Sequence, residues 1–238
     1  MNKTLLIDDG PFETRAALLE DGQLLEIQIE RPDNLSRIGD FFNGRVAKLL
    51  PDMNIAFVDL GPFGDGFLQL ADIQSKATSI NSAVREGEKL LVQVIKDAKG
   101  EKAIQLGGRF ALHGTNLILR PKGSGVALPK SINAQSERDR LKNLLEGHAR
   151  EYGLAVRTSA RQATDAELVM ELGALVKDWA DIQAAWKTAK KPGPLGPEKT
   201  PLTNILKSLA TANTSVITNS AATFNATKDY VASRIPNA

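Results

Sequence analysis

The sequence predicts an α+β protein in which a small five-stranded barrel is inserted into a second, split domain. Two observations predict this fold class. Short strand-like segments separated by turns containing glycine or proline fill residues 38–106, as in small closed barrels. Three strand-like segments before residue 31 have no covering helix until after residue 136, so later strands and helices must complete their sheet. The split falls at about residues 37 and 109.

The composition is that of an ordinary globular chain and excludes several protein classes. The 238 residues are 42% hydrophobic and 24% charged, with a formal net charge of only +2. No apolar run approaches the roughly 20 residues of a membrane-spanning helix, and acidic residues follow the N-terminus too soon for a secretory signal. The absence of cysteine excludes disulfides and thiolate zinc sites. We therefore expect a cytoplasmic protein without a membrane anchor.

The opening segment reads as three strands. Residues 4–7, 14–19 and 24–30 are rich in apolar and β-branched side chains. Asp21 and Gly22 separate the last two segments, and Asp-Gly is a strong signal for a tight hairpin turn. The sequence therefore predicts a hairpin here, followed by a break at residues 31–34.

Aromatic and basic residues mark the barrel region as a candidate grip for single-stranded nucleic acid. Phe57 and Phe67 lie on strand-like segments on either side of the glycine-rich turn 61–66, and Arg45 lies upstream. A base stacked on a protein ring contributes about 1–3 kcal/mol. Basic residues follow the strand-like segment 89–96 at its end, namely Lys96, Lys99 and Lys102. The alternative is that both rings fill the barrel core, the usual place for aromatic side chains on strands.

The remainder of the chain alternates strands and helices. A helix over residues 136–152 is predicted by apolar side chains at spacings of three and four. A second begins at the capping box Thr164–Glu167 and runs through Trp186, with Lys187, Lys190 and Lys191 in a solvated last turn. Residues 192–197 read as a loop. The other expected elements are strands 116–119, 126–128, 154–158 and 215–218, and helices 203–210 and 222–234.

Several short motifs occur in a fixed order along nearly the whole chain. They are Glu13-Thr14-Arg15, residues 27–31, Gly44-Arg45-Val46, residues 56–59, Gly66-Phe67-Leu68, Val92-Gln93-Val94 with Lys102, and Val156-Arg157-Thr158. This set resembles the N-terminal half of the ribonuclease E/G family. The resemblance implies a five-stranded oligonucleotide-binding (OB-fold) barrel of the S-one type, inserted in a split ribonuclease-H-like α/β subdomain. The implied domains are residues 1–37, 38–108 and 109–238, the last carrying a 5′-phosphate pocket and the start of the following region.

The resemblance also assigns residues to RNA. Phe57, Phe67 and Lys102 match barrel residues that contact single-stranded RNA, and Arg45 is the cation that we add to this set. Arg157 and Thr158 match the pocket for the 5′-monophosphate of the RNA.

The 5′-phosphate pocket is also chemically plausible from its residues. A guanidinium takes phosphate through two donors, and a hydroxyl adds another. Arg161 and the helix start near Thr164 lie close by in the sequence, and helix N-termini attract anions. The alternative for Arg157 is a surface ion pair. Both histidines, His113 and His148, are expected to be structural, because two unpaired histidines in a chain without cysteine are poor evidence for a metal site.

The chain departs from the family pattern in several places. Leu106-Gly107-Gly108 stands where the family usually has Leu-Thr-Thr, and Asn43 replaces a commonly basic residue. The family's catalytic domain, with its magnesium-holding carboxylates, has no counterpart here, nor does the cysteine-containing zinc link of the ribonuclease E branch. We therefore expect no catalytic residue and no cofactor in this chain, and magnesium only with the catalytic domain.

The sequence thus leads to one main hypothesis and two alternatives. The main hypothesis is RNA binding with 5′-monophosphate end sensing, as the N-terminal part of an endoribonuclease for RNA processing and decay or as a shortened relative. The expected partners are single-stranded RNA and, by resemblance, further copies of the chain. One alternative is a non-RNA interaction scaffold, since fold does not fix function. The other is a magnesium-dependent nuclease using its own carboxylates, Asp8, Asp9, Asp165, Glu167 and Asp178.

Overall fold

The computed structural model describes residues 3–100, 102–197, 199–211 and 213–234. The chain divides into two compact units, each assembled from separate stretches of sequence. The first comprises Met1–Leu35, Thr164–Ala174 and Glu198–Ala238, and the second comprises Ser36–Ala163 and Leu175–Pro197. The domain boundaries expected from the sequence stay predictions.

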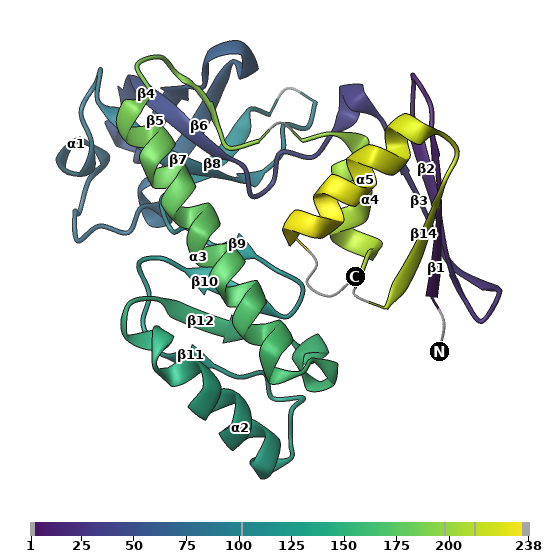
Figure 1. The fold of residues 1–238 in the computed structure, drawn as a ribbon. Helices are drawn as coiled ribbons and strands as arrows, with labels where there is room; N and C mark the ends of the chain where they lie inside the picture. Colours follow the sequence, from purple (N-terminus) through teal and green to yellow (C-terminus); the bar gives the residue numbers. More distant parts are fainter. Residues whose placement is uncertain (1–2, 101, 198, 212, 235–238) are drawn as a thin grey trace. The chain divides into compact units, whose positions relative to one another are not determined.

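The first unit is built on a four-stranded sheet of order β14-β1-β2-β3 (Figure 1). Its strands are β1 (Lys3–Asp9), β2 (Thr14–Glu20), β3 (Gln23–Glu30) and β14 (Thr214–Thr218). The first three form an antiparallel meander, and β14 lies parallel to β1. Between β2 and β3, Asp21 and Gly22 have φ values of 49° and 81°, as a two-residue type I′ hairpin turn requires. The late strand that completes the opening sheet is β14.

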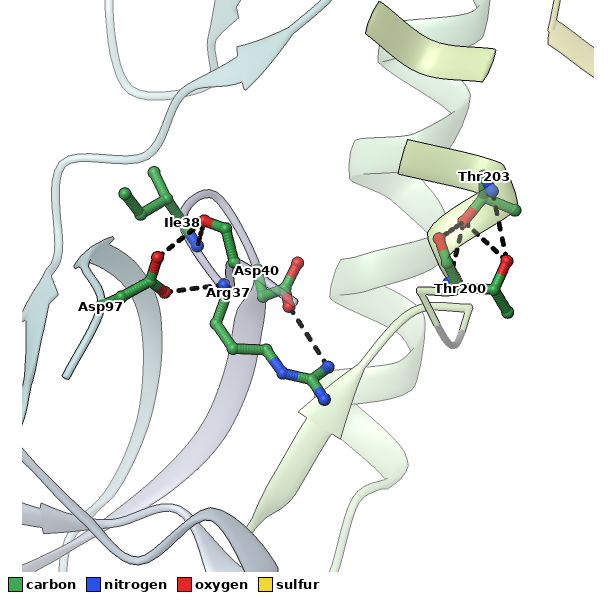
Figure 2. Close-up of polar contacts among 7 residues, drawn as sticks. Arg37, Ile38, Asp40, Asp97, Thr200 and Thr203 are labelled. Atoms are coloured by element: carbon green, nitrogen blue, oxygen red, sulfur yellow. Dashed lines mark hydrogen bonds and ion pairs between the residues drawn. The ribbon is translucent and has the colours of Figure 1, made fainter. Parts of the chain in front are cut away.

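One face of this sheet is covered by helix α4 (Pro201–Leu209), with α5 (Ala221–Arg234) following β14 (Figure 1). Their shared core consists of Leu5, Ile7, Ala16, Leu18, Leu202, Ile205, Leu206, Leu209 and Ala210. Helix α4 begins at a reciprocal cap between Thr200 and Thr203 (Figure 2). The Thr203 amide donates to Thr200 Oγ1 at 3.2 Å, and the Thr200 amide donates to Thr203 Oγ1 at 2.9 Å. The cap satisfies two donors that the helix start would leave unpaired.

The opposite face of the sheet is apolar and exposed. The strand register aligns Ile27, Ala17, Leu6 and Ile217 in one row across all four strands. Ile27, Leu6 and Ile217 are 61%, 39% and 56% exposed. An antiparallel sheet with one solvated face normally carries polar side chains there, so this face is unusual for a surface.

The second unit contains a closed barrel of five strands, in the order β4-β5-β6-β8-β7 with β7 returning to β4. The strands are β4 (Phe41–Leu50), β5 (Ile55–Asp59), β6 (Asp65–Gln69), β7 (Lys89–Lys96) and β8 (Ile104–Gly107). Strands β6 and β8 are parallel, and the other neighbouring barrel strands are antiparallel. Helix α1 (Ile80–Ala83) lies between β6 and β7. The predicted fold class, an α+β chain with an OB-type barrel inserted in a split α/β part, is confirmed.

The chain enters the barrel through a turn that Asp97 fixes (Figure 2). The two carboxylate oxygens of Asp97 accept hydrogen bonds from the Ser36 hydroxyl and the Arg37 amide, each at 2.7 Å. The Arg37 guanidinium lies 3.7 Å from the Asp40 carboxylate and 4.5 Å from the centroid of the Phe63 ring. These contacts tie the segment before β4 to the end of β7.

A small second sheet of order β11-β12-β10-β9 follows the barrel in the same unit. Its strands are β9 (Leu112–His113), β10 (Leu117–Arg120), β11 (Val126–Ala127) and β12 (Gly153–Val156). Helix α2 (Gln135–Glu146) contributes the buried Leu141 and Leu145. It ends before Gly147, and one 3₁₀ turn continues it (His148–Arg150), so the prediction of a helix to residue 152 was too long. Glycine costs about 1 kcal/mol relative to alanine inside a helix, which favours this end.

Helix α3 (Asp165–Thr188) begins at the predicted capping box, in which Thr164 and Glu167 bond reciprocally. It ends at Thr188, so Lys190 and Lys191 lie beyond the last turn in which the sequence placed them. The predicted loop that follows contains a strand, β13 (Gly193–Leu195), antiparallel to β4. Strand β5 pairs with β4 only from Arg45 onward, which leaves residues 41–43 an open edge that β13 fills. Its central residue, Pro194, lacks an N–H, which is tolerated on an edge strand.

No helix among the described residues is long and apolar enough to cross a membrane.

Lys89 fixes the end of α3 against the barrel, and its removal is expected to destabilise the second unit. Its ammonium donates to the carbonyls of Trp186 and Ala189, at 2.5 and 2.7 Å. Hydrogen bonds that involve a charged group contribute about 1.5–3 kcal/mol. Lys89→Met is therefore expected to lower the free energy of unfolding by about that amount in a urea titration. Lys96→Met, at the exposed other end of β7, is the control and should change it by less than about 0.5 kcal/mol. Equal stability of the two variants would contradict this role of Lys89.

Candidate nucleic-acid interface

The outer surface of the barrel carries one continuous row of side chains across its five strands. Phe57 of β5 lies directly opposite Phe67 of β6. The row continues on one side to Lys48 of β4, and on the other through Gln105 of β8 to Lys96 of β7. Directly opposed residues on neighbouring strands have Cβ atoms about 4.5–5.5 Å apart. The row therefore forms two adjacent rings with a lysine at each end.

Both rings lie outside the barrel core. Along β5 and β6, Ala56, Val58 and Leu68 are buried in the core, whereas Phe57 and Phe67 are half-buried on the opposite face. This alternation follows from the period of two along a strand. The rings are partly held by their neighbours and still present surface to solvent, which suits stacking.

Two bulges bring the lysines into this row. The register of β4 against β5 shifts between Val46 and Lys48, and that of β7 against β8 shifts between Val94 and Lys96. A bulge adds one residue to one strand and so re-aims the side chains that follow. Without the shifts, Ala47 and Ile95 would occupy the two ends of the row.

The loops at the same barrel add charge. OB-type barrels bind oligonucleotides on the face of their second and third strands and with the loops joining strands 1–2 and 4–5. Here those strands are β5 and β6, and the loop between β7 and β8 carries the exposed Lys99 and Lys102. The backbones of these two lysines bond to each other in both directions at 3.1 Å. Phe57 and Phe67 thus lie on the second and third strands of the barrel, and Lys102 lies in the loop joining the fourth and fifth.

The other barrel residues singled out in the sequence have different surroundings. Arg45 is exposed, donates to the Gly87 carbonyl at 3.2 Å, and lies opposite Asp59. Asn43 is buried, and its amide donates to the Lys191 carbonyl at 2.7 Å. The asparagine at this commonly basic position therefore anchors the segment before β13.

Two carboxylates flank the aromatic pair on one side. Asp59 of β5 lies directly opposite Asp65 of β6, two residues along from Phe57 and Phe67. Opposed like charges repel each other, and they repel phosphate equally. The charges therefore favour an anionic ligand along the row from Lys48 to Lys96 over one along the length of β5 and β6.

The predicted phosphate residues lie at the end of the small sheet, where three segments meet. The Arg157 amide donates to the Asn116 carbonyl at 2.8 Å, which holds the end of β12 beside the start of β10. The Thr158 hydroxyl lies 3.0 Å from the Ser131 hydroxyl. The Arg157 guanidinium is exposed, and its Nη2 lies 3.4 Å from Nδ1 of His113 on β9. The structure therefore brings Arg157 and Thr158 together with two residues that the sequence analysis did not assign.

The loop that carries Ser131 is fixed by a cation from α2. Arg138 donates through Nη1 to the carbonyls of Pro129 and Ile132, at 3.2 and 2.9 Å. Ile132 is buried, which adds an apolar anchor. Ser131 is thus held on a rigid support.

Two other residues expected near the phosphate, Arg161 and Thr164, each have a carboxylate nearby. The charge of Arg161 acts on Glu137 of α2. At the start of α3, Glu167 accepts from the Thr164 amide at 2.7 Å, and the Glu167 amide donates to Thr164 Oγ1 at 3.3 Å. The cap contacts leave the amide and hydroxyl of Thr164 less available to an anion.

The carboxylates of the nuclease alternative act as hydrogen-bond acceptors. Asp9 accepts from the hydroxyls of Thr14 at 2.5 Å and Thr223 at 3.2 Å, and Asp8 accepts from Asn219 Nδ2 at 2.7 Å. Within residues 3–100, 102–197, 199–211 and 213–234, no group of three or more His, Asp or Glu side chains is placed to hold a metal ion. The described carboxylates therefore do not form a metal site.

Sequence reasoning missed four residues of these two surfaces: Lys48, Gln105, His113 and Ser131. Gln105 could have been placed beside the rings from the strand pattern together with the parallel pairing of β6 and β8. Lys48 depends on the β4 bulge, and His113 and Ser131 approach Arg157 and Thr158 only through the fold. No local signal marks these three.

The pKa of Glu137 is expected to respond to Arg140. Arg140 donates two hydrogen bonds to the Glu137 carboxylate at 2.7 and 2.9 Å, which lowers the pKa of Glu137, and Arg161 acts in the same direction. Because the folded-state pKa is lowered, the stabilisation is present above the unfolded value, about 4.3. It is lost as the pH falls through the folded-state pKa. Arg140→Gln should raise the pKa of Glu137 in an NMR titration, and Lys177→Gln, which removes the Asp181 pair of α3, should not. An unchanged pKa in Arg140→Gln would refute the coupling.

Comparison with known proteins gives the family of the chain. Residues 111–238 match the model of the ribonuclease E/G family. The chain is 32% identical to ribonuclease G of Escherichia coli K12 over 99% of its own length and 51% of that protein. It is 36% identical to ribonuclease G of Haemophilus influenzae over 75% of its length and 39% of that protein. With ribonuclease E of Nostoc the identity is 29%, over 91% of this chain and 32% of that protein.

The chain thus spans about half, or less, of the length of these relatives. The family match extends over the small sheet with Arg157 and on to the end of the chain, and the longer alignments include the barrel. This chain belongs to the ribonuclease E/G family.

Proposed function

We propose that this chain binds single-stranded RNA across the outer face of its barrel and senses a 5′-monophosphate end at Arg157 and Thr158. In this proposal it is the N-terminal part, or a shortened relative, of a ribonuclease E/G-type endoribonuclease that acts in RNA processing and decay. The observation that carries the proposal is the pairing of Phe57 with Phe67 in a row that ends in Lys48 and Lys96.

The chemistry of the row supports a single strand as the ligand. Bases stack on rings irrespective of their identity, and phosphates are attracted by cations at the ends of the row. The formal net charge of the chain is only +2, so RNA binding depends on local lysines. The RNA affinity should therefore decrease only modestly as the salt concentration rises. This arrangement favours a clamp with weak sequence preference.

The chemistry of the pocket supports a terminal phosphate as the ligand. A guanidinium offers a planar fork of donors to phosphate oxygens, and the next residue, Thr158, has its hydroxyl 3.0 Å from that of Ser131. A 5′-hydroxyl end offers no such charge. The pocket therefore supports a preference for phosphorylated RNA ends.

The proposal assigns binding and positioning to this chain, and no catalytic residue. Phosphodiester hydrolysis with magnesium belongs, in this proposal, to the part of the relatives that this chain does not cover. Self-association and a cytoplasmic location are further parts of it. A nuclease using Asp8 and its neighbours has no support from the described carboxylates.

Replacing either ring of the barrel row is expected to weaken RNA binding. Phe57→Leu and Phe67→Leu remove one stacking surface each, worth about 1–3 kcal/mol or roughly 5- to 150-fold in Kd. The measurement is fluorescence anisotropy with a labelled single-stranded RNA of about ten nucleotides at low salt. Phe12→Leu is the matched control, because Phe12 is 84% exposed and lies in the first unit. Unchanged affinity in both barrel variants would refute the proposed role of the row in RNA binding. No RNA binding by the unaltered chain would favour the scaffold alternative.

End sensing is expected to depend on Arg157. The unaltered chain should bind a 5′-monophosphate RNA more tightly than the same RNA with a 5′-hydroxyl, and Arg157→Ala should abolish the difference. Affinity for the 5′-hydroxyl RNA should stay unchanged, because the barrel is intact. Arg120→Ala, at an exposed position of the same small sheet, is the control and should retain the preference. Equal affinity of the unaltered chain for both RNAs would refute 5′-end sensing and leave only general binding of single-stranded RNA.

A further inference from the structure

His113 lies on the same exposed face of the small sheet as Arg157. Leu112 is buried and His113 is exposed, so β9 turns its last side chain outward. His113 pairs with Ile118 of β10, and Ile118 pairs with Ala155 of β12. Arg157 follows Ala155 by two residues and therefore belongs to the same face. The two side chains approach from the two strands that flank β10.

The contact between them is open to an anion. Nη2 of Arg157 and Nδ1 of His113 are 3.4 Å apart, at the long end of the hydrogen-bond range. A guanidinium has five donors, so one long contact to a ring nitrogen leaves most of its fork available. An oxygen atom held by Arg157 would therefore lie within reach of the imidazole as well.

The imidazole suits a phosphate ligand. A neutral ring has one donor and one acceptor, whereas an imidazolium donates from both nitrogens. A phosphate monoester carries about −1.5 to −2 charges at pH 7, so a ring N–H that donates to it makes a charge-assisted hydrogen bond.

We propose that His113 is a ligand of the 5′-terminal phosphate and acts together with Arg157. This inference rests on the proposed end-sensing function and adds a residue that the sequence analysis expected to be structural. The phosphate would be held from three segments, by His113 of β9, by Arg157 with Thr158 after β12, and by Ser131 of the loop after β11.

The test compares the full chain with three variants, using two RNAs of about ten nucleotides that differ only in a 5′-monophosphate or a 5′-hydroxyl. The quantity measured is the ratio of the two Kd values. His113→Gln is expected to reduce this ratio about 3- to 10-fold, the size of one net hydrogen bond, without changing the Kd for the 5′-hydroxyl RNA. His113→Arg, which places another hydrogen-bond donor at the same position, should restore most of the ratio, and His148→Gln should leave it unchanged.

A spectroscopic readout separates a ligand from a structural neighbour. The chain has two histidines, so His148→Gln leaves one set of imidazole ring signals in an NMR spectrum. These His113 signals are expected to shift on saturation with the 5′-monophosphate RNA and to stay in place with the 5′-hydroxyl RNA.

Each other outcome overturns the inference in an identifiable way. If the unaltered chain prefers the phosphorylated RNA and His113→Gln keeps the full ratio, the proposed function stands and His113 is not a ligand. If His113→Gln weakens both RNAs equally, its role is structural. If the unaltered chain shows no preference, end sensing itself fails, and the assignment of His113 fails with it.

Discussion

Strand β4 pairs with three other strands, and the second unit depends on this pairing. One edge of β4 pairs with β7, which closes the barrel, and the other edge is shared by β5 and β13. The buried Phe42 lies within this stretch, at the pairing with both β7 and β13. Closure leaves the barrel without the open edges that invite further strand pairing. It also fixes which side chains face inward and which face the solvent.

The outer row of the barrel follows directly from closure. Once inward positions are filled by aliphatic side chains, the alternation of β5 and β6 turns Phe57 and Phe67 outward at the same level. Neighbouring strands of a closed sheet then add one side chain each to that level. A surface of two rings and two lysines is thus a consequence of the core packing and the register, and it requires no loop to be ordered by a ligand.

The proposed phosphate site around Arg157 has a different construction. Its side chains come from a strand end, a loop and a 3₁₀ turn, and each is held by backbone contacts: Arg157 by the Asn116 carbonyl, and the Ser131 loop by Arg138. Donors on fixed supports lose little entropy when an anion binds. In the proposed function, the barrel row and the Arg157 site are therefore two separate surfaces of the second unit.

The sequence by itself determined the features that depend on neighbouring residues. The Asp21-Gly22 turn, the capping box of Thr164 and Glu167, and the existence of most strands and helices follow from local backbone preferences and periodicity. The resemblance to a known family singled out Phe57, Phe67, Arg157 and Thr158 as candidate RNA-binding residues.

Only the tertiary structure decided what depends on pairing between distant strands. Residues 193–195 form a strand because they pair with the open edge of β4. Two bulges place Lys48 and Lys96, rather than Ala47 and Ile95, at the ends of the aromatic row. Register is a property of two strands together, so neither strand's own sequence contains it.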